Sequence, residues 1–181
     1  VSLTNVVPSA GLRLLADILV GGILAGIAGF LVGVPVLRLR GDYLAIVTLA
    51  FGEIIKNIVN CLYVGVDSSG LHIGMTNSNA LGLAEGGKVI MNGPMGATGV
   101  PKLSTFFAGF LLVLFTLAVV QNLVQSRAGR AIMAIRDNRI AAESVGISIT
   151  RYKLTAFITS AILAGMAGAL FAMNYSTVVA K

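Results

Sequence analysis

Four polar side chains within an apolar stretch are the residues of this chain that could do chemistry. They are Glu53, Lys56, Asn57 and Asn60. The spacing i, i+3, i+4 and i+7 places all four on one face of a helix. An ionised side chain near the centre of a bilayer costs about 2.5 to 3.5 kcal/mol on insertion scales, so Glu53 and Lys56 must pair or face a polar path. A pair that only locks neighbouring helices and a face that lines a translocation route both remain open.

Residue types that support catalysis or metal binding are scarce. Cys61 is the single cysteine and His72 the single histidine, which excludes an internal disulfide and leaves no set of soft ligands for a structural zinc ion. We find no Ser, His and Asp triad that His72 could complete. The sequence therefore predicts a protein without catalytic residues, metal ligands or a cofactor.

One segment comes close to a phosphate-binding loop. Residues 82–89, GLAEGGKV, nearly match the pattern G-x-x-x-x-G-K-[ST]. Val89 stands where the pattern needs a hydroxyl group for magnesium, and no apolar strand precedes the segment. We therefore expect no nucleotide site at this position.

The composition predicts an integral membrane protein. Hydrophobic residues make up 56% and charged residues 11% of the chain, against about 25% charged residues in soluble domains, and the mean hydropathy is +0.92. Much of the positive charge lies in two stretches, Arg38 with Arg40 and residues 127–153, as is typical of cytoplasmic loops. Aromatic residues that could stack on bases are not interleaved with these charges, so nucleic acid is not an expected partner.

Membrane spans can be drawn where about 20 residues pass with few charges. The four predicted spans are residues 18–37, 43–66, 103–125 and 154–173. With both basic loops in the cytoplasm, the spans alternate in direction without contradiction, which places residues 67–102 outside and residues 126–153 inside. The predicted fold is an all-α, polytopic helical bundle that forms one transmembrane domain over residues 1–181. The outer segment is expected to hold a short surface helix or a re-entrant piece.

Small residues recur at intervals of four in the first and fourth spans. They are Gly22 with Gly26, Gly29 with Gly33, and Ala161, Gly165 and Ala169. Such spacing lets helix backbones approach closely where lipid provides no hydrophobic drive. Packing within one subunit is the simpler expectation, and a dimer seam is the alternative.

The inner segment, residues 126–153, carries six basic residues between two apolar spans. Residues 130–146 are good helix formers without proline, which predicts one short helix along the inner membrane face. Ile132 and Ile135 offer an apolar side of this helix. Its charged side is formed by Arg136, Arg139 and Glu143. From the charges alone, a solvated basic loop and a docking element both fit.

Two long stretches resemble a known family. LRLRGDYLAIVTLAFGEIIKNI, residues 37–58, and GRAIMAIRDNRIAAESVGI, residues 129–147, are similar to the LivM-type permease subunits of ATP-binding-cassette importers for branched-chain amino acids. A third and weaker similarity is NGPMGATGVP, residues 92–101. Together with the spans between them, these stretches cover most of the chain.

The resemblance implies an all-helical permease with several partners. Such permeases pair with a homologous permease subunit, receive substrate from an extracytoplasmic binding protein and dock two ATPase subunits through a cytoplasmic coupling helix. By similarity, coupling falls on Arg130, Ala134, Ile135, Arg136, Asp137, Asn138, Ala141, Ala142, Glu143 and Gly146. Ile140 replaces the first Glu of the importer pattern E-A-A-x-x-x-G, so the charged contact with the ATPase is left to Arg136, Asp137 or Glu143.

The function implied by the resemblance is transport, and the chain is not expected to be an enzyme. It would move branched-chain or similar hydrophobic amino acids across the cytoplasmic (inner) membrane of a prokaryote, while partner chains hydrolyse ATP. Related permeases serve urea or short amides, and an ion-coupled secondary transporter that uses Glu53 and Lys56 is the other alternative. Family permeases carry further spans on both sides of this region, so we expect the chain to be part of a longer protein.

Overall fold

The computed structural model describes residues 10–37, 39, 42–67, 70–75, 88–98, 104–175 and 177–178. The chain divides into two compact units. We call residues 14–45 and 104–170 the helical unit, and residues 1–13, 46–103 and 171–181 the sheet unit. Each unit is described by itself.

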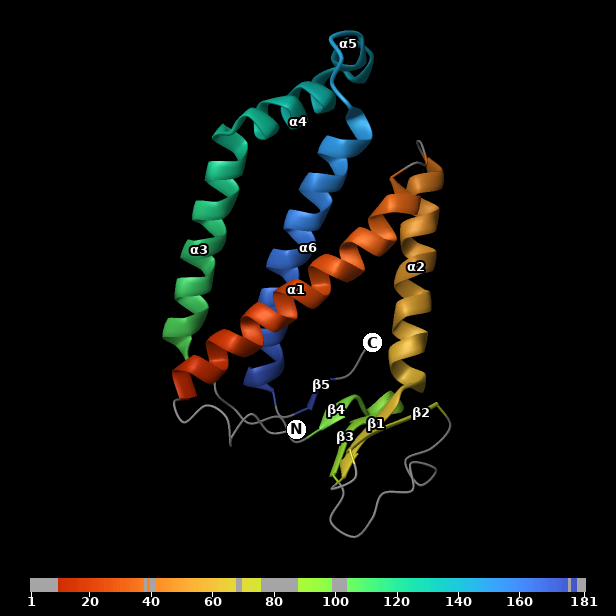
Figure 1. Cartoon of the computed structure of the whole chain (residues 1–181), viewed down its shortest axis with the longest axis vertical. Helices are drawn as coiled ribbons and strands as arrows, with labels where there is room; N and C mark the ends of the chain where they lie inside the picture. The colour runs from red at the N-terminus through yellow and green to blue at the C-terminus, as the bar shows by residue number, and fades with distance from the viewer. Residues whose placement is uncertain are drawn as a thin grey trace. The chain divides into compact units, whose positions relative to one another are not determined.

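Five helices contribute to the helical unit. They are α1 (Ala10–Val36), α3 (Phe106–Gln125), α4 (Arg127–Asp137), α5 (Arg139–Ser144) and α6 (Ile149–Asn174). In Figure 1, α4 turns away sharply at the end of α3, and α5 leads back toward the start of α6. The first and fourth predicted spans correspond to α1 and α6; α1 extends beyond the predicted limits at its start, and α6 at both ends. α1 begins eight residues before residue 18, because a helix continues through charged residues such as Arg13 and Asp17 when these lie near its end.

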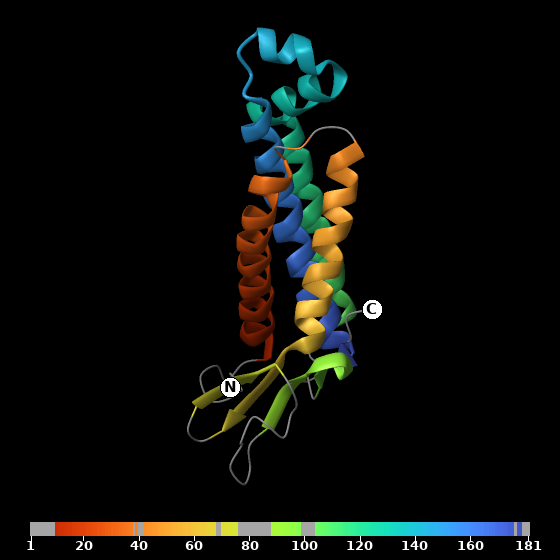
Figure 2. The same ribbon diagram turned by 90° about the vertical axis from the view of Figure 1, so that its right-hand side faces the viewer.

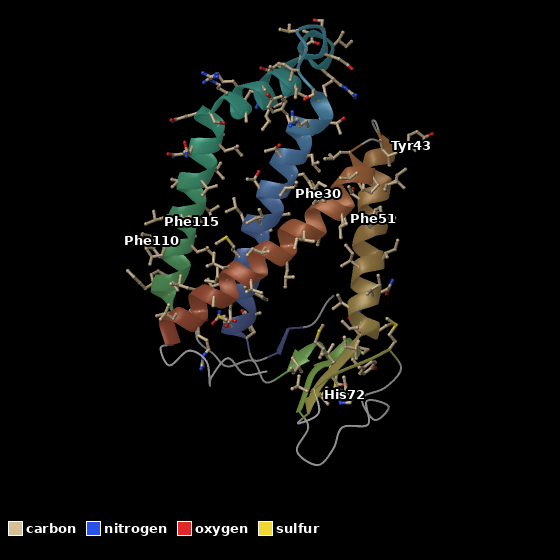
Figure 3. The ribbon with its side chains drawn as sticks, viewed as in Figure 1. Phe30, Tyr43, Phe51, His72, Phe110 and Phe115 are labelled. Carbon is tan, nitrogen blue, oxygen red and sulfur yellow. The ribbon has the colours of Figure 1, made fainter. Side chains whose placement is uncertain are left out.

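Three described helices are long and apolar enough to cross a membrane: α1 from Gly11, α3 and α6. α3 has no buried residue within the chain, and most of its large side chains are exposed. Phe110 and Phe115, for example, point away from α6 (Figure 3). An apolar helix with exposed leucine and phenylalanine side chains is suited to contact with lipid or with other membrane helices.

α1 and α6 pack against each other through glycines. A β-carbon built on each of five α1 glycines lies 3.0 Å or less from an atom of α6, and these glycines are Gly21, Gly22, Gly26, Gly29 and Gly33. Opposite them, a β-carbon on Gly165 contacts the β-carbon of Ala25 and lies 2.7 Å from the carbonyl oxygen of Gly21. The contact therefore brings backbone against backbone, as Figure 1 shows where α1 crosses α6. The expectation that the small residues pack within one subunit is confirmed.

The sheet unit includes most of α2 (Asp42–Cys61), followed by a small sheet. Its strands are β1 (Tyr63–Asp67), β2 (Gly70–Gly74), β3 (Lys88–Asn92), β4 (Ala97–Thr98) and β5 (Thr177–Val178). They form an antiparallel sheet in the order β2-β1-β3-β4-β5, and Figure 2 shows β1, β2 and β3 beyond the end of α2. A short 3-10 turn, η3 (Gly93–Met95), joins β3 to β4.

The turn η3 fits tightly against the end of α2. A β-carbon at Gly93 would lie 2.6 Å from the ring of Tyr63 and 2.8 Å from the carbonyl oxygen of Asn60. The backbone N–H of Gly93 donates a hydrogen bond to the carbonyl oxygen of Leu62 at 3.2 Å. The third stretch that resembled the family, residues 92–101, thus begins with a turn that only glycine fits.

Two predictions need correction here. The second span does not continue to residue 66, because the helix ends at Cys61 and β1 begins at Tyr63. The described part of residues 67–102 holds strands and η3 in place of a surface helix or re-entrant piece, so the mostly helical fold includes a small sheet. Residues 82–87 of the phosphate-loop segment lie outside the described residues, and Lys88 and Val89 belong to β3. α2 is not among the candidate spans, so its crossing of the membrane stays a prediction.

Replacing Gly165 by alanine tests the close contact of α1 with α6. The added methyl group meets Ala25 and the backbone of Gly21, so we expect a loss of about 1–3 kcal/mol in the free energy of unfolding. The measurement is thermal unfolding of the purified chain in detergent, followed by circular dichroism. Gly168→Ala is the matched control, because a β-carbon at Gly168 has no atom within 4 Å. Equal melting temperatures for the two variants would contradict the contact.

Candidate functional site

The joint between α3 and α4 is built by Ser126 and Gly129. The Ser126 hydroxyl group donates a hydrogen bond to the carbonyl oxygen of Leu123 at 2.6 Å and accepts one from the N–H of Gly129 at 3.1 Å. A β-carbon at Gly129 would collide with the carbonyl oxygens of Leu123 and Val124. Ser126 therefore caps α4, and Gly129 allows the chain to turn within a single residue.

Asn138 divides the predicted coupling helix into two. Its backbone is extended, with φ −149° and ψ 107°, and its side-chain oxygen accepts a hydrogen bond from the N–H of Ala141 at 3.0 Å. Its own N–H donates to the carbonyl oxygen of Ala134 at 3.0 Å. Asn138 thus ends α4 and caps α5, and the prediction of one continuous helix over residues 130–146 is wrong.

Three buried aliphatic residues join α4, α5 and α6. Ile135 of α4, Ala142 of α5 and Ile149 of α6 form one cluster, against which Ile147 and Tyr152 pack. Each of the three buried side chains is at most 8% exposed. Since they come from three successive helices, the cluster holds α4 and α5 to the first turn of α6 as one rigid piece. We call residues 127–152 the coupling segment.

The coupling segment closes at Gly146, which has a φ of +85°. The N–H of Gly146 donates to the carbonyl oxygen of Glu143 at 3.0 Å, and the N–H of Ile147 donates to that of Ala142 at 3.1 Å. A left-handed residue directly after a short helix is the ordinary way to end it, and glycine adopts it without strain. Gly146 therefore directs the chain from α5 back to α6.

The outer surface of the coupling segment exposes apolar side chains. Ile140 is 82% and Val145 79% exposed, at the two ends of α5. Arg136 and Asp137 form an ion pair of 3.2 Å between adjacent, exposed residues, whereas Arg139 and Glu143 have no ion pair in the described structure. The segment therefore combines a buried core with an apolar tip, Ile140 and Val145, that the chain itself does not cover.

The ten residues predicted to couple the permease to ATPase subunits thus have different structural positions. Ile135 and Ala142 lie in the core, and Asn138 and Gly146 shape the turns. The side chains that remain available to a partner are those of Arg130, Arg136, Asp137, Ala141 and Glu143, which are exposed, while Ala134 is half-buried. Sequence reasoning missed Ser126 and Ile149, although a serine before a helical stretch is a recognisable cap signal.

The predicted polar face lies on α2 in the sheet unit. Lys56 Nζ lies 3.3 Å from Glu53 Oε2, and the Glu53 side chain is 66% exposed while that of Lys56 is 37% exposed. Asn57 is exposed, and the half-buried Asn60 has a side-chain oxygen without a hydrogen-bond partner among the described residues. The structure therefore pairs the two charges without burying them in the chain. Among the described residues no cluster of His, Cys, Asp and Glu could hold a metal ion.

An Asn138→Ala substitution tests the cap of α5. Loss of the side-chain acceptor leaves the N–H of Ala141 without its partner, which typically costs about 0.5–2 kcal/mol. We expect faster amide hydrogen exchange over residues 139–145, measured by mass spectrometry. Asn138→Asp keeps an acceptor at the same position and is the control. Equal exchange in the wild type and Asn138→Ala would show that the cap does not stabilise α5.

Comparison with protein families matches residues 2–181 to the description "Branched-chain amino acid transport system / permease component". The high-affinity branched-chain amino acid transport system permease proteins LivM of Salmonella typhimurium and Escherichia coli are each 41% identical over 162 residues. These alignments cover 83% and 84% of this chain and 38% of each relative. The probable branched-chain amino acid transport permease protein LivM of Methanocaldococcus jannaschii is 25% identical over 184 residues, which cover 99% of this chain and 49% of the relative. No solved structure matches the chain.

Proposed function

Since the chain belongs to the family of permease components of branched-chain amino acid transport systems, we propose that it is the membrane part of an importer driven by ATP hydrolysis on other subunits. The chain spans 38% of the length of the two bacterial relatives. We assign it to the inner membrane of a prokaryote, with aliphatic amino acids as the transported substrates. The names of the relatives support this choice of substrate over urea or short amides.

The exposed tip of the coupling segment is the observation that carries the proposal. A basic loop that only meets water has no need for a packed core, yet Ile135, Ala142 and Ile149 form one. It also has no need to present Ile140 and Val145 almost fully exposed at both ends of a short helix. A rigid element with uncovered apolar side chains and a charged rim is suited to insertion into a partner's cleft.

The mechanism follows from the connections of this element within the helical unit. A force on α5 reaches α6 through Ala142 and Ile149, because both side chains belong to one buried cluster. α6 in turn contacts α1 along the glycines that include Gly21 and Gly165. Packed helices shift as rigid bodies. If two ATPase subunits bind α5 and then move toward each other, α6 and α1 would therefore shift with α5. The chain itself contributes motion and no chemical step.

The proposal includes three kinds of partner. ATPase subunits would bind the tip of the coupling segment on the cytoplasmic side, and a homologous permease subunit would complete the membrane assembly. An extracytoplasmic binding protein would deliver the amino acid. The basic character of residues 126–153 supports the cytoplasmic placement of the tip, because Lys and Arg are enriched in cytoplasmic loops.

Acidic substitutions at the tip test the proposal. We expect Ile140→Asp combined with Val145→Asp to lower copurification of the ATPase subunits and amino-acid uptake by about tenfold or more, because carboxylates would enter an apolar contact. Copurification from membranes and uptake of a labelled branched-chain amino acid are the measurements.

Thr150→Asp serves as the control for this experiment. Thr150 is exposed in the first turn of α6, where an acidic residue is favourable at a helix N-terminus. This variant should insert, retain the ATPase subunits and transport normally. If the variant with two substitutions at the tip does the same, the tip formed by Ile140 and Val145 is not the docking element.

We also propose that Glu53 and Lys56 line a polar route in the assembled importer. Their 3.3 Å pair lies on a helix face that also carries Asn57 and Asn60, and the chain leaves Glu53 largely exposed. An exposed charged pair on a helix that crosses the membrane needs either a polar path or a partner helix beside it. Asn57 and Asn60 extend the same helix face with polar side chains, which favours a polar route over a partner helix.

Charge substitutions distinguish a route from a locking pair. Glu53→Gln should reduce uptake by about tenfold with normal insertion and assembly, since a route needs the charge itself. The exchange of the two charges, Glu53→Lys with Lys56→Glu, keeps the pair but reverses its order. We expect uptake to remain low in this double variant. Recovery of uptake in it would show that the pair only locks helices.

A further inference from the structure

A cavity of about 420 Å³ lies within the helical unit, where the coupling segment meets the start of α6. Its lining residues are Ile132, Ile135, Arg136, Arg139 and Lys153. Three of the five are cations, and none is acidic. They come from α4, α5 and the second turn of α6, so three helices contribute to one cationic pocket.

The charges of this pocket are only partly compensated within the chain. Arg136 forms the 3.2 Å ion pair with Asp137, but Arg139 and Lys153 have no carboxylate within 4 Å in the described structure. Both side chains are half-buried, and burial removes part of their hydration. Two half-buried cations that converge on one cavity favour an anion with several acceptor oxygen atoms.

The position of Lys153 identifies the source of the anion. α6 is one of the helices apolar enough to cross a membrane, and Lys153 is four residues from its start, about 6 Å along the helix axis. In a helix that crosses the membrane, a residue this near the end lies at the level of the lipid headgroups. Part of the pocket lining is apolar, since Ile132 and the buried Ile135 lie beside the cations. Basic pockets at the ends of membrane helices are suited to anionic lipid headgroups.

We propose that this pocket binds the phosphate group of an anionic phospholipid, with Arg139 and Lys153 as its principal ligands. A lipid at this position would contact α4, α5 and α6 together and would anchor the coupling segment to the membrane surface. The proposal depends on α6 crossing the membrane and is independent of the transported substrate.

The test measures lipid binding to the purified full chain in detergent. Cardiolipin and phosphatidylglycerol are titrated separately, and bound lipid is counted by native mass spectrometry. We expect Arg139→Gln with Lys153→Gln to weaken lipid binding by about tenfold or more, since each cation near an anionic headgroup adds to the binding free energy. The control is Arg127→Gln with Arg151→Gln, which removes the same charge from exposed residues outside the pocket and should change binding by less than about twofold.

Two further arms separate lipid binding from misfolding and from capture of free phosphate. The charge-conserving variant Arg139→Lys with Lys153→Arg should bind lipid within about threefold of the wild type, which excludes misfolding as the cause of a loss. Inorganic phosphate at the lipid concentration should not displace the lipid, because it lacks the acyl chains that the membrane position selects. Equal losses in the pocket and control pairs, displacement by free phosphate, or unchanged lipid binding in the Arg139→Gln with Lys153→Gln variant would each overturn the lipid assignment.

Discussion

The packing of Ile135, Ala142 and Ile149 is the interaction on which the coupling segment depends. Short helices such as α5 are unstable by themselves, since few backbone hydrogen bonds offset the entropy of ordering them. Here α5 has six residues and is held by a cap at one end, a glycine turn at the other and Ala142 in between. The small alanine side chain allows α5 to lie directly against its two neighbours. Without this cluster, α4 and α5 would lose the buried contact that holds them to the start of α6.

In the same helical unit, the candidate spans α1 and α6 are held together by a different kind of contact. Between helices in lipid the hydrophobic effect offers little, so close backbone packing has to provide the contact energy. The glycines of α1 and Gly165 of α6 supply this packing. In the helical unit, aliphatic side chains hold α4 and α5 to the start of α6, and glycine contacts hold the rest of α6 to α1.

The coupling segment and the start of α6 also present two chemically distinct surfaces. Ile140 and Val145 are exposed at the tip, whereas Arg139 and Lys153 converge on a pocket. In the chain sequence these residues are intermixed, because a helix places neighbouring residues on different faces. This explains why the sequence showed that the stretch is basic but did not show which of its residues form the tip and which form the pocket. The ion pair of Arg136 with Asp137 was likewise not predicted, because adjacent helical residues do not normally face each other.

The sequence alone determined what depends on local composition. Apolar length predicted helices at α1, α3 and α6, the spacing of Glu53 and Lys56 predicted their common face, and two long stretches indicated the family. Tertiary structure decided what depends on distant partners. The end of α2 at Cys61 follows from the pairing of β1 with β3, in a sheet that β5 (Thr177–Val178) completes from the far end of the chain. Burial of Ala142 and the choice of α6 as the partner of the α1 glycines likewise require contacts that no local pattern contains.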